Sequence, residues 1–264
     1  MKGSLALGRI FFGLAVVGSG VQQLCRQECV RLVPKGHADL ATSFWWPAVI
    51  SGLVLVAAGL AILANRKRRP AGIIMVALLM LVLALYWPDV SAQPGRGFVW
   101  TNPAKTLALI GGAALLAGIS TSGSAVNTVD RRAWWIGAVF FSLFLALGGV
   151  QHFVYADFVA NLVPAWIPPG QIFWTWFTGI ALLTGGVGLL IPPTARIAAM
   201  SVATMILLWV VLLHIPRALA NPQDPGETSA ICEALALSGV GWLLAGTVHR
   251  AGNPDGTSRR ATEL

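Results

Sequence analysis

Eight apolar runs, each close to the length of a membrane-spanning helix, follow one another along almost the whole of this 264-residue chain. A helix needs roughly 20 mostly apolar residues to cross a hydrocarbon layer about 30 Å thick. Charged residues, prolines or polar loops bound the runs, which cover residues 5–24, 45–64, 71–87, 104–120, 133–152, 172–191, 197–214 and 231–248. Only 11% of the residues are charged, so little of the chain could form the surface of a soluble domain. The sequence predicts an all-α, polytopic membrane helix bundle with eight transmembrane helices.

The distribution of basic residues predicts the orientation of this bundle. The net charge is +8, and an even number of spans places both termini on the same side. That side then carries the larger group of cations, which comprises Lys2, Arg9, Arg66, Lys67, Arg68, Arg69, Arg131, Arg132, Arg196, Arg250, Arg259 and Arg260. Because Lys and Arg gather on the cytoplasmic side of membrane proteins, we expect a multi-pass protein of the plasma (inner) membrane with both termini cytoplasmic. The cations are then contacts for the lipid bilayer, and no nucleic-acid partner is expected.

Similar segments in the two halves of the chain indicate an internal duplication. Residues 20–34 (GVQQLCRQECVRLVP) align with residues 149–164 (GVQHFVYADFVANLVP) after a one-residue insertion, which pairs Gln22 with Gln151. Further pairs are Gly52 with Gly179, Gly59 with Gly186, Tyr86 with His214 and Pro88 with Pro216. Four helices per half give both halves the same orientation, so we expect a parallel tandem repeat of four. The predicted halves are residues 1–120 and 133–249, followed by a disordered cytoplasmic tail at 250–264.

Polar side chains collect at the predicted outer ends of the helices. Ion-coupled transporters usually carry ionisable groups near the membrane midplane, and no predicted span has one there, which disfavours a transporter. An imidazole, a carboxylate and amide donors could instead bind the carbonyl groups of a quinone and exchange its protons. The candidate catalytic residues are therefore His152, Asp157 and His214. The candidate cofactor-binding residues are Gln22, Gln151, Tyr155, Trp166 and Trp174.

Other interpretations of the same residues remain open at this stage. His152 and His214 could simply meet headgroups and water at helix ends, or they could ligate a haem. A metal site would add His37 and Asp157, but no spacing fixes its geometry and none is assigned. Most tryptophans are expected in the interfacial aromatic belt. Cys25, Cys29 and Cys232 could form a disulfide, act as a redox dithiol or stay free, because their pairing cannot be read from sequence.

Three segments of the second half resemble the DoxX family of small membrane proteins. They read GVQHFVYADFVANLVPAW, WTWFTGIALLTGGVGLL and LLHIPRALANP, and the resemblance spans residues 134–246 and, more weakly, the first half. Typical members resemble one four-helix unit, so this chain looks like two fused units. The family includes membrane subunits similar to those of thiosulfate:quinone oxidoreductase. The resemblance implies a quinone-linked redox role at the extracytoplasmic face.

Two functional hypotheses follow. In the first, the protein is a membrane subunit of a redox complex that passes electrons from an extracytoplasmic or membrane redox partner protein to quinone. In the second, it is a non-catalytic scaffold or assembly factor whose helices hold a partner protein. A lipid-accessible apolar cavity with both histidines facing inward would favour the first.

Overall fold

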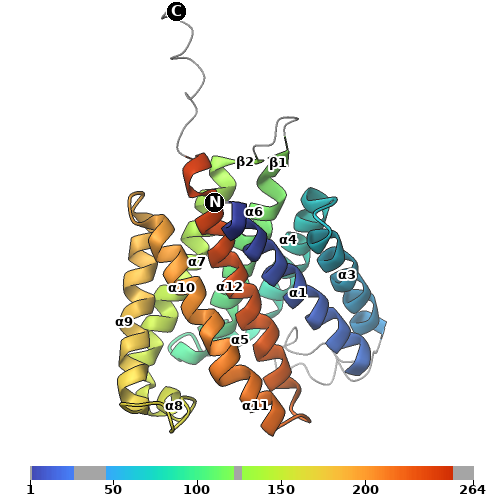
Figure 1. Cartoon of the computed structure of the whole chain (residues 1–264). Coiled ribbons are helices and arrows are strands. Elements are labelled where there is room, and N and C mark those ends of the chain that lie inside the picture. Colours follow the sequence, from blue (N-terminus) through green and yellow to red (C-terminus); the bar gives the residue numbers. More distant parts are fainter. Residues whose placement is uncertain (1, 27–45, 122–126, 252–264) are drawn as a thin grey trace, which may run out of the picture.

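The computed structural model describes residues 2–26, 46–121 and 127–251, and these residues are almost entirely helical (Figure 1). The helices of the first half are α1 (Lys2–Arg26), α3 (Trp46–Leu63), α4 (Arg68–Leu85), α5 (Trp87–Ala92), the 3-10 turn η2 (Gly97–Trp100) and α6 (Thr101–Gly118). Those of the second half are α7 (Arg131–Val154), α8 (Ala156–Ala160), α9 (Gln171–Leu190), α10 (Ala195–Trp209), the π-helical turn η3 (Val210–His214), α11 (Ile215–Ala220) and α12 (Pro225–Ala251). Between the halves, the short strands β1 (Ile119–Thr121) and β2 (Asn127–Val129) pair antiparallel.

In the part of the chain that the structure describes, seven helices are long and apolar enough to cross a membrane: α1, α3, α4 with α5, α7, α9, α10 with α11, and α12. Their outward side chains are apolar, including Leu53, Leu81, Val187 and Ile197, all more than half exposed. Exposed apolar area of this extent would be unfavourable in water and is expected against lipid. The described chain therefore fits a multi-pass integral membrane protein.

Helix α6, expected as the eighth span, forms as predicted but falls outside this set of seven. Its first turns carry Thr101, Asn102 and Lys105, which lower its mean hydropathy. It packs between α4, α7 and α12, and most of its later residues are buried. A helix that faces other helices rather than lipid does not need a uniformly apolar surface. Length and hydropathy thus identify seven of the eight predicted spans.

The eight long helices of the described residues form a closed ring in which each packs on two neighbours. The order is α1, α3, α4, α6, α7, α9, α10 and α12, and α12 returns to pack on α1. Helix α12 also contacts α6 and α7, so it lies toward the centre. In its most apolar 18-residue stretch, 67% is buried inside the protein. In the other six candidate spans this buried share is 44% or less. The first helix of each half therefore packs on the last helix of the other half.

Glycines allow the helices of the bundle to approach closely at corresponding positions of the two halves. A Cβ at Gly20 would lie 2.7 Å from the Gly52 carbonyl oxygen, and one at Gly149 would lie 2.9 Å from the Gly179 carbonyl oxygen. No larger residue fits at such distances without separating the helices. In lipid, where burial of apolar area does not drive association, close backbone packing is a main source of helix affinity.

The paired glutamines Gln22 and Gln151 make the same cross-half hydrogen bonds. Gln22 Nε2 donates to the Pro225 carbonyl oxygen at 2.8 Å, and its Oε1 accepts from Ser229 Oγ at 3.1 Å. Gln151 Nε2 donates to the Gly97 carbonyl oxygen at 2.8 Å and to Thr101 Oγ1 at 2.9 Å. Each glutamine thus joins the first helix of one half to the start of the last helix of the other, and we call the two sets the glutamine clamps.

Replacing Gln151 with Leu should lower the free energy of unfolding by about 1–3 kcal/mol, because the change removes hydrogen bonds and strands the Gly97 carbonyl oxygen. Thermal unfolding in detergent measures the loss. The matched control is Gln93→Leu, since Gln93 is exposed and lies outside the clamps. Equal melting temperatures for the two variants would contradict the clamp.

Candidate functional site: an apolar groove that ends at two histidines

A large apolar groove runs between α9 and α10 on the outer surface of the second half. Its volume is about 1440 Å³, and its walls come from α9, α10, η3, the end of α7, and the segment from α8 to α9. Figure 1 shows α9 and α10 joined at one end and diverging toward α8 at the other. The lining extends along α9 from Trp174 to Ile191, which is about 25 Å at 1.5 Å per residue. The groove therefore runs along most of a membrane-spanning helix.

The lining of the groove is apolar even where threonines contribute to it. Thr175 Oγ1 donates to the Gln171 carbonyl oxygen at 2.9 Å, Thr184 Oγ1 to Ile180 O at 2.8 Å, and Thr204 Oγ1 to Met200 O at 2.8 Å. These hydroxyls are satisfied by their own helices. Most other lining residues are Leu, Ile, Val, Ala, Met or Gly. The surface suits an extended hydrocarbon chain.

His152 contributes a half-buried imidazole to the end of the groove that lies near α8. Its Nδ1 lies 2.6 Å from the Gly148 carbonyl oxygen, one turn earlier in α7. A carbonyl oxygen can only accept, so we assign the proton to Nδ1, which makes Nε2 the acceptor of the neutral ring. The indole of Trp209 stacks on this imidazole with centroids 6.2 Å apart and an interplanar angle of 24°. Trp209 therefore helps to fix the orientation of His152.

His214 reaches the same groove from the opposite wall, at the end of the π-helical turn η3. Pro216 follows two residues later; its ring has no N–H and crowds the carbonyl of Leu212, which disfavours a regular α-helix here. In a π-turn, hydrogen bonds connect residues five apart, so Trp209 and His214 fall on one face. His214 Nδ1 is buried and has no hydrogen-bond partner in the described part of the chain. An unpaired buried polar atom beside a groove is a candidate ligand contact.

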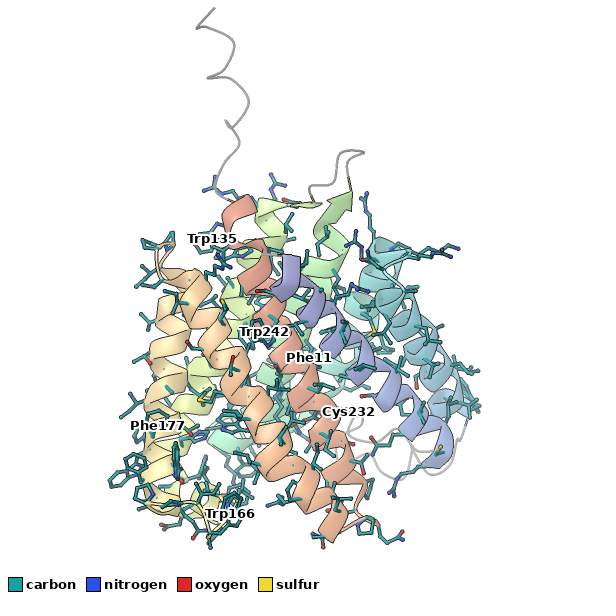
Figure 2. The ribbon with its side chains drawn as sticks, viewed as in Figure 1. Phe11, Trp135, Trp166, Phe177, Cys232 and Trp242 are labelled. Atoms are coloured by element: carbon teal, nitrogen blue, oxygen red, sulfur yellow. The ribbon has the colours of Figure 1, made fainter. Side chains whose placement is uncertain are left out.

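The groove unites three of the residues that the sequence singled out: His152, His214 and Trp174. Trp174 Nε1 donates to the Pro168 carbonyl oxygen at 2.9 Å, so its ring is held at the groove wall. Asp157 and Trp166 do not line the groove; both are exposed, and Trp166 is 71% exposed at the α8 end of the bundle (Figure 2). The pairing of His152 with Asp157 in one pocket therefore does not form.

The other predicted ligand residues lie at contacts between the halves. Tyr155 packs against Gly97, where its hydroxyl would lie 2.8 Å from a Cβ at that glycine. Gln151 and Gln22 belong to the glutamine clamps, which occupy their amide groups. Their geometry is that of structural residues, and binding of a cofactor by these three stays a prediction.

Sequence reasoning missed Trp209 and the π-turn. The π-turn had a signal in the sequence, since Pro216 two residues after His214 marks a break in the helix. Sequence alone could not show that Trp209 stacks on a histidine of α7, because the contact joins residues 57 positions apart only after α7, α9 and α10 have packed.

The structure covers most of the candidate metal ligands and two of the three cysteines. The described residues contain no group of three or more His, Cys, Asp or Glu side chains that could hold a metal ion. Cys25 and Cys232 are free thiols, the first exposed and the second half-buried. The predicted contributions of Cys29 and His37, and most of the predicted tail, fall outside the described ranges.

Comparison with known proteins matches residues 141–240 to a family described as Domain of unknown function (DUF8561). The matched segment runs from the middle of α7 to the middle of α12 and so contains every residue that lines the groove. No curated protein and no solved structure matches the chain.

The resemblance to the DoxX family is wrong, because the same residues match DUF8561 and no DoxX match is found. Lipid as a solvent restricts membrane helices to a narrow set of residues, rich in Leu, Val, Ala and Gly, so short apolar segments of unrelated families look alike. The redox role that this resemblance implied loses that support. What remains is the groove itself and its two histidines.

Proposed function

We propose that this integral membrane protein binds an amphiphile of the isoprenoid-quinone class in the groove between α9 and α10. One observation carries the proposal: two histidines, His152 and His214, lie at one end of a long apolar groove. A ligand with a hydrogen-bonding head and a long apolar chain matches both parts of this lining.

The two imidazoles differ in the hydrogen bonds that they can offer to a head group. His214 Nδ1, when it carries the proton, would donate to a quinone carbonyl oxygen. His152 Nε2 would accept a hydrogen bond from a quinol hydroxyl, because its Nδ1 is held by Gly148. Trp209 and Trp174 provide flat surfaces beside them on which a ring can stack. The site thus suits both redox forms of such a head group.

Binding of quinone does not by itself make the protein an oxidoreductase subunit. Electron transfer would require a redox partner protein. The proposal therefore covers ligand binding, with His152 and His214 as the contact residues. A scaffold without a ligand is the competing function.

Titration of the purified protein in detergent with a water-soluble ubiquinone should show saturable binding, weakened about tenfold by His152→Ala or His214→Ala, since one lost hydrogen bond of about 1.4 kcal/mol corresponds to that factor. Trp87→Ala is the matched control, because Trp87 is 66% exposed and does not line the groove. Absence of saturable binding in the parent protein would instead favour the scaffold.

We further propose that α6 is the eighth crossing, that the chain is a duplicated four-helix unit and that both termini are cytoplasmic. The matching glycine contacts and the two glutamine clamps support the duplication. The start of α1 and the end of α12 lie at the same end of the bundle (Figure 1), as an even number of crossings requires. Basic residues of the α3–α4 turn and of the first turn of α7 gather there as well.

Labelling of intact cells with a membrane-impermeant maleimide tests this orientation. In a cysteine-free background, Gly95→Cys should react from outside, whereas Arg66→Cys should react only after lysis. A Cβ at Gly95 meets nothing within 4 Å, and Arg66 is exposed, so neither change should disturb packing. The reverse pattern would place the termini outside.

A further inference from the structure

We propose that the helices of the first half, together with α12, form a second, separate ligand site, which binds a small neutral molecule carrying a carbonyl group. The site is a partly open cavity of about 120 Å³ lined by α1, α3, α4, α6 and α12. It shares no lining residue with the groove, so it does not depend on the function proposed for the groove.

The duplication gives this cavity its place in the fold. Gln23 is the counterpart of His152 in the repeat, and Tyr86 is the counterpart of His214. Both line the small cavity, as the two histidines line the groove. The same two positions of the four-helix unit therefore face a cavity in each half, with different side chains and different chemistry.

The polar end of the cavity contains an ion pair whose charges cancel. Lys105 Nζ lies 2.9 Å from Glu233 Oε2, and both side chains are about three-quarters buried. An ionised ligand would add a net charge to this weakly solvated site and would lose its own hydration, whereas a neutral dipolar ligand would not. The electrostatics thus favour a neutral molecule.

The hydrogen-bonding capacity that remains favours an acceptor on the ligand. Gln23 is only 3% exposed and lines the cavity; its Oε1 accepts from Ser51 Oγ at 2.8 Å, and its Nε2 amide is a donor. Lys105 uses one of its three N–H groups for Glu233. Both groups can donate to a carbonyl oxygen, which fits a ketone or amide better than an amine.

The apolar end of the cavity and its volume set the size of the ligand. Phe12, Leu55, Met75 and Leu79 line this end. An apolar protein cavity of about 150 Å³ accommodates benzene, so the slightly smaller volume here suits a single ring or a short chain. The occupant therefore differs in size from the long amphiphile proposed for the groove.

Cys232 supplies a natural probe of the cavity. Its thiol lines the cavity on the lower half of α12, beside α1 (Figure 2).

The test uses the full chain with Cys25→Ser and Cys29→Ser, and compares alkylation of Cys232 by iodoacetamide and by iodoacetate. The two reagents are similar in size, but only iodoacetamide is neutral. After correction for their rates with a free thiol, iodoacetamide should react at least about tenfold faster, which corresponds to 1.4 kcal/mol of discrimination against the charge. Its rate should saturate, and acetamide should compete.

Charge variants test whether the ion pair of Lys105 and Glu233 causes the preference for iodoacetamide over iodoacetate. Glu233→Gln leaves Lys105 as an uncompensated cation, so the preference should shift toward iodoacetate. Glu227→Gln is the matched control, because Glu227 pairs with Arg217 outside the cavity and its loss should leave the preference unchanged. Equal corrected rates that rise linearly with reagent, no competition by acetamide, or an unreactive Cys232 in the parent protein would each overturn the proposal.

Discussion

Replacing Ala181 with Trp should weaken quinone binding at least about 100-fold, which is the loss of roughly 2.7 kcal/mol, while the protein remains folded. Ala181 lies on α9 in the wall of the groove, and an indole at this position would occupy the space between α9 and α10. The apolar chain of a ligand could then no longer extend along the helix from the histidines. The effect should exceed that of either histidine variant, because it removes space rather than a single hydrogen bond.

The adjacent residue provides the control for this prediction. Ile180 is 55% exposed and does not line the groove, so Ile180→Trp adds the same side chain to the outer surface of the same helix. Titration of both variants with the same quinone, together with their melting temperatures, separates blockage from misfolding. If both variants bind quinone as tightly as the parent does, the groove is not the binding site. If both variants lose binding, blockage of the groove is not the cause of the loss.

Replacing Gly239 with Leu should prevent stable folding, and Gly239→Ala should lower the melting temperature by about 5–10 °C. A Cβ at Gly239 would lie 2.7 Å from the Phe12 backbone nitrogen and 3.0 Å from the Gly8 carbonyl oxygen. Neither backbone atom can move unless α1 and α12 separate. Overpacking of this kind costs about 1–3 kcal/mol, and a cost at the upper end corresponds to the stated temperature shift for a chain of this size.

Gly148→Ala is the matched control for the smaller change. A Cβ at Gly148 meets only the Leu182 Cδ1 atom at 3.6 Å, which is an ordinary contact. The melting temperatures of the two alanine variants are measured in the same detergent. Gly239→Ala adds a methyl group where α1 and α12 cross, and Gly148→Ala adds one where there is space for it. A melting temperature of Gly239→Ala equal to that of the parent would show that α1 and α12 do not pack as described.

The glutamine clamps show what sequence similarity between the halves can and cannot indicate about tertiary contacts. Gln22 and Gln151, which the alignment pairs, make matching contacts. Their amides, however, bond to the start of the last helix in the opposite half, which no local pattern could indicate. A polar residue near a helix end is equally compatible with a ligand contact and with a tertiary contact.

The amino-acid sequence by itself determined that this chain forms apolar helices of membrane-spanning length, because lipid leaves backbone N–H and C=O groups no partner except one another. It also placed the helix breaks, since Pro88 and Pro216 interrupt helices wherever they lie. Only the tertiary structure decided which polar residues meet. His152 and His214 line one groove and the exposed Asp157 does not, because the groove forms only where α7, α9 and α10 pack together.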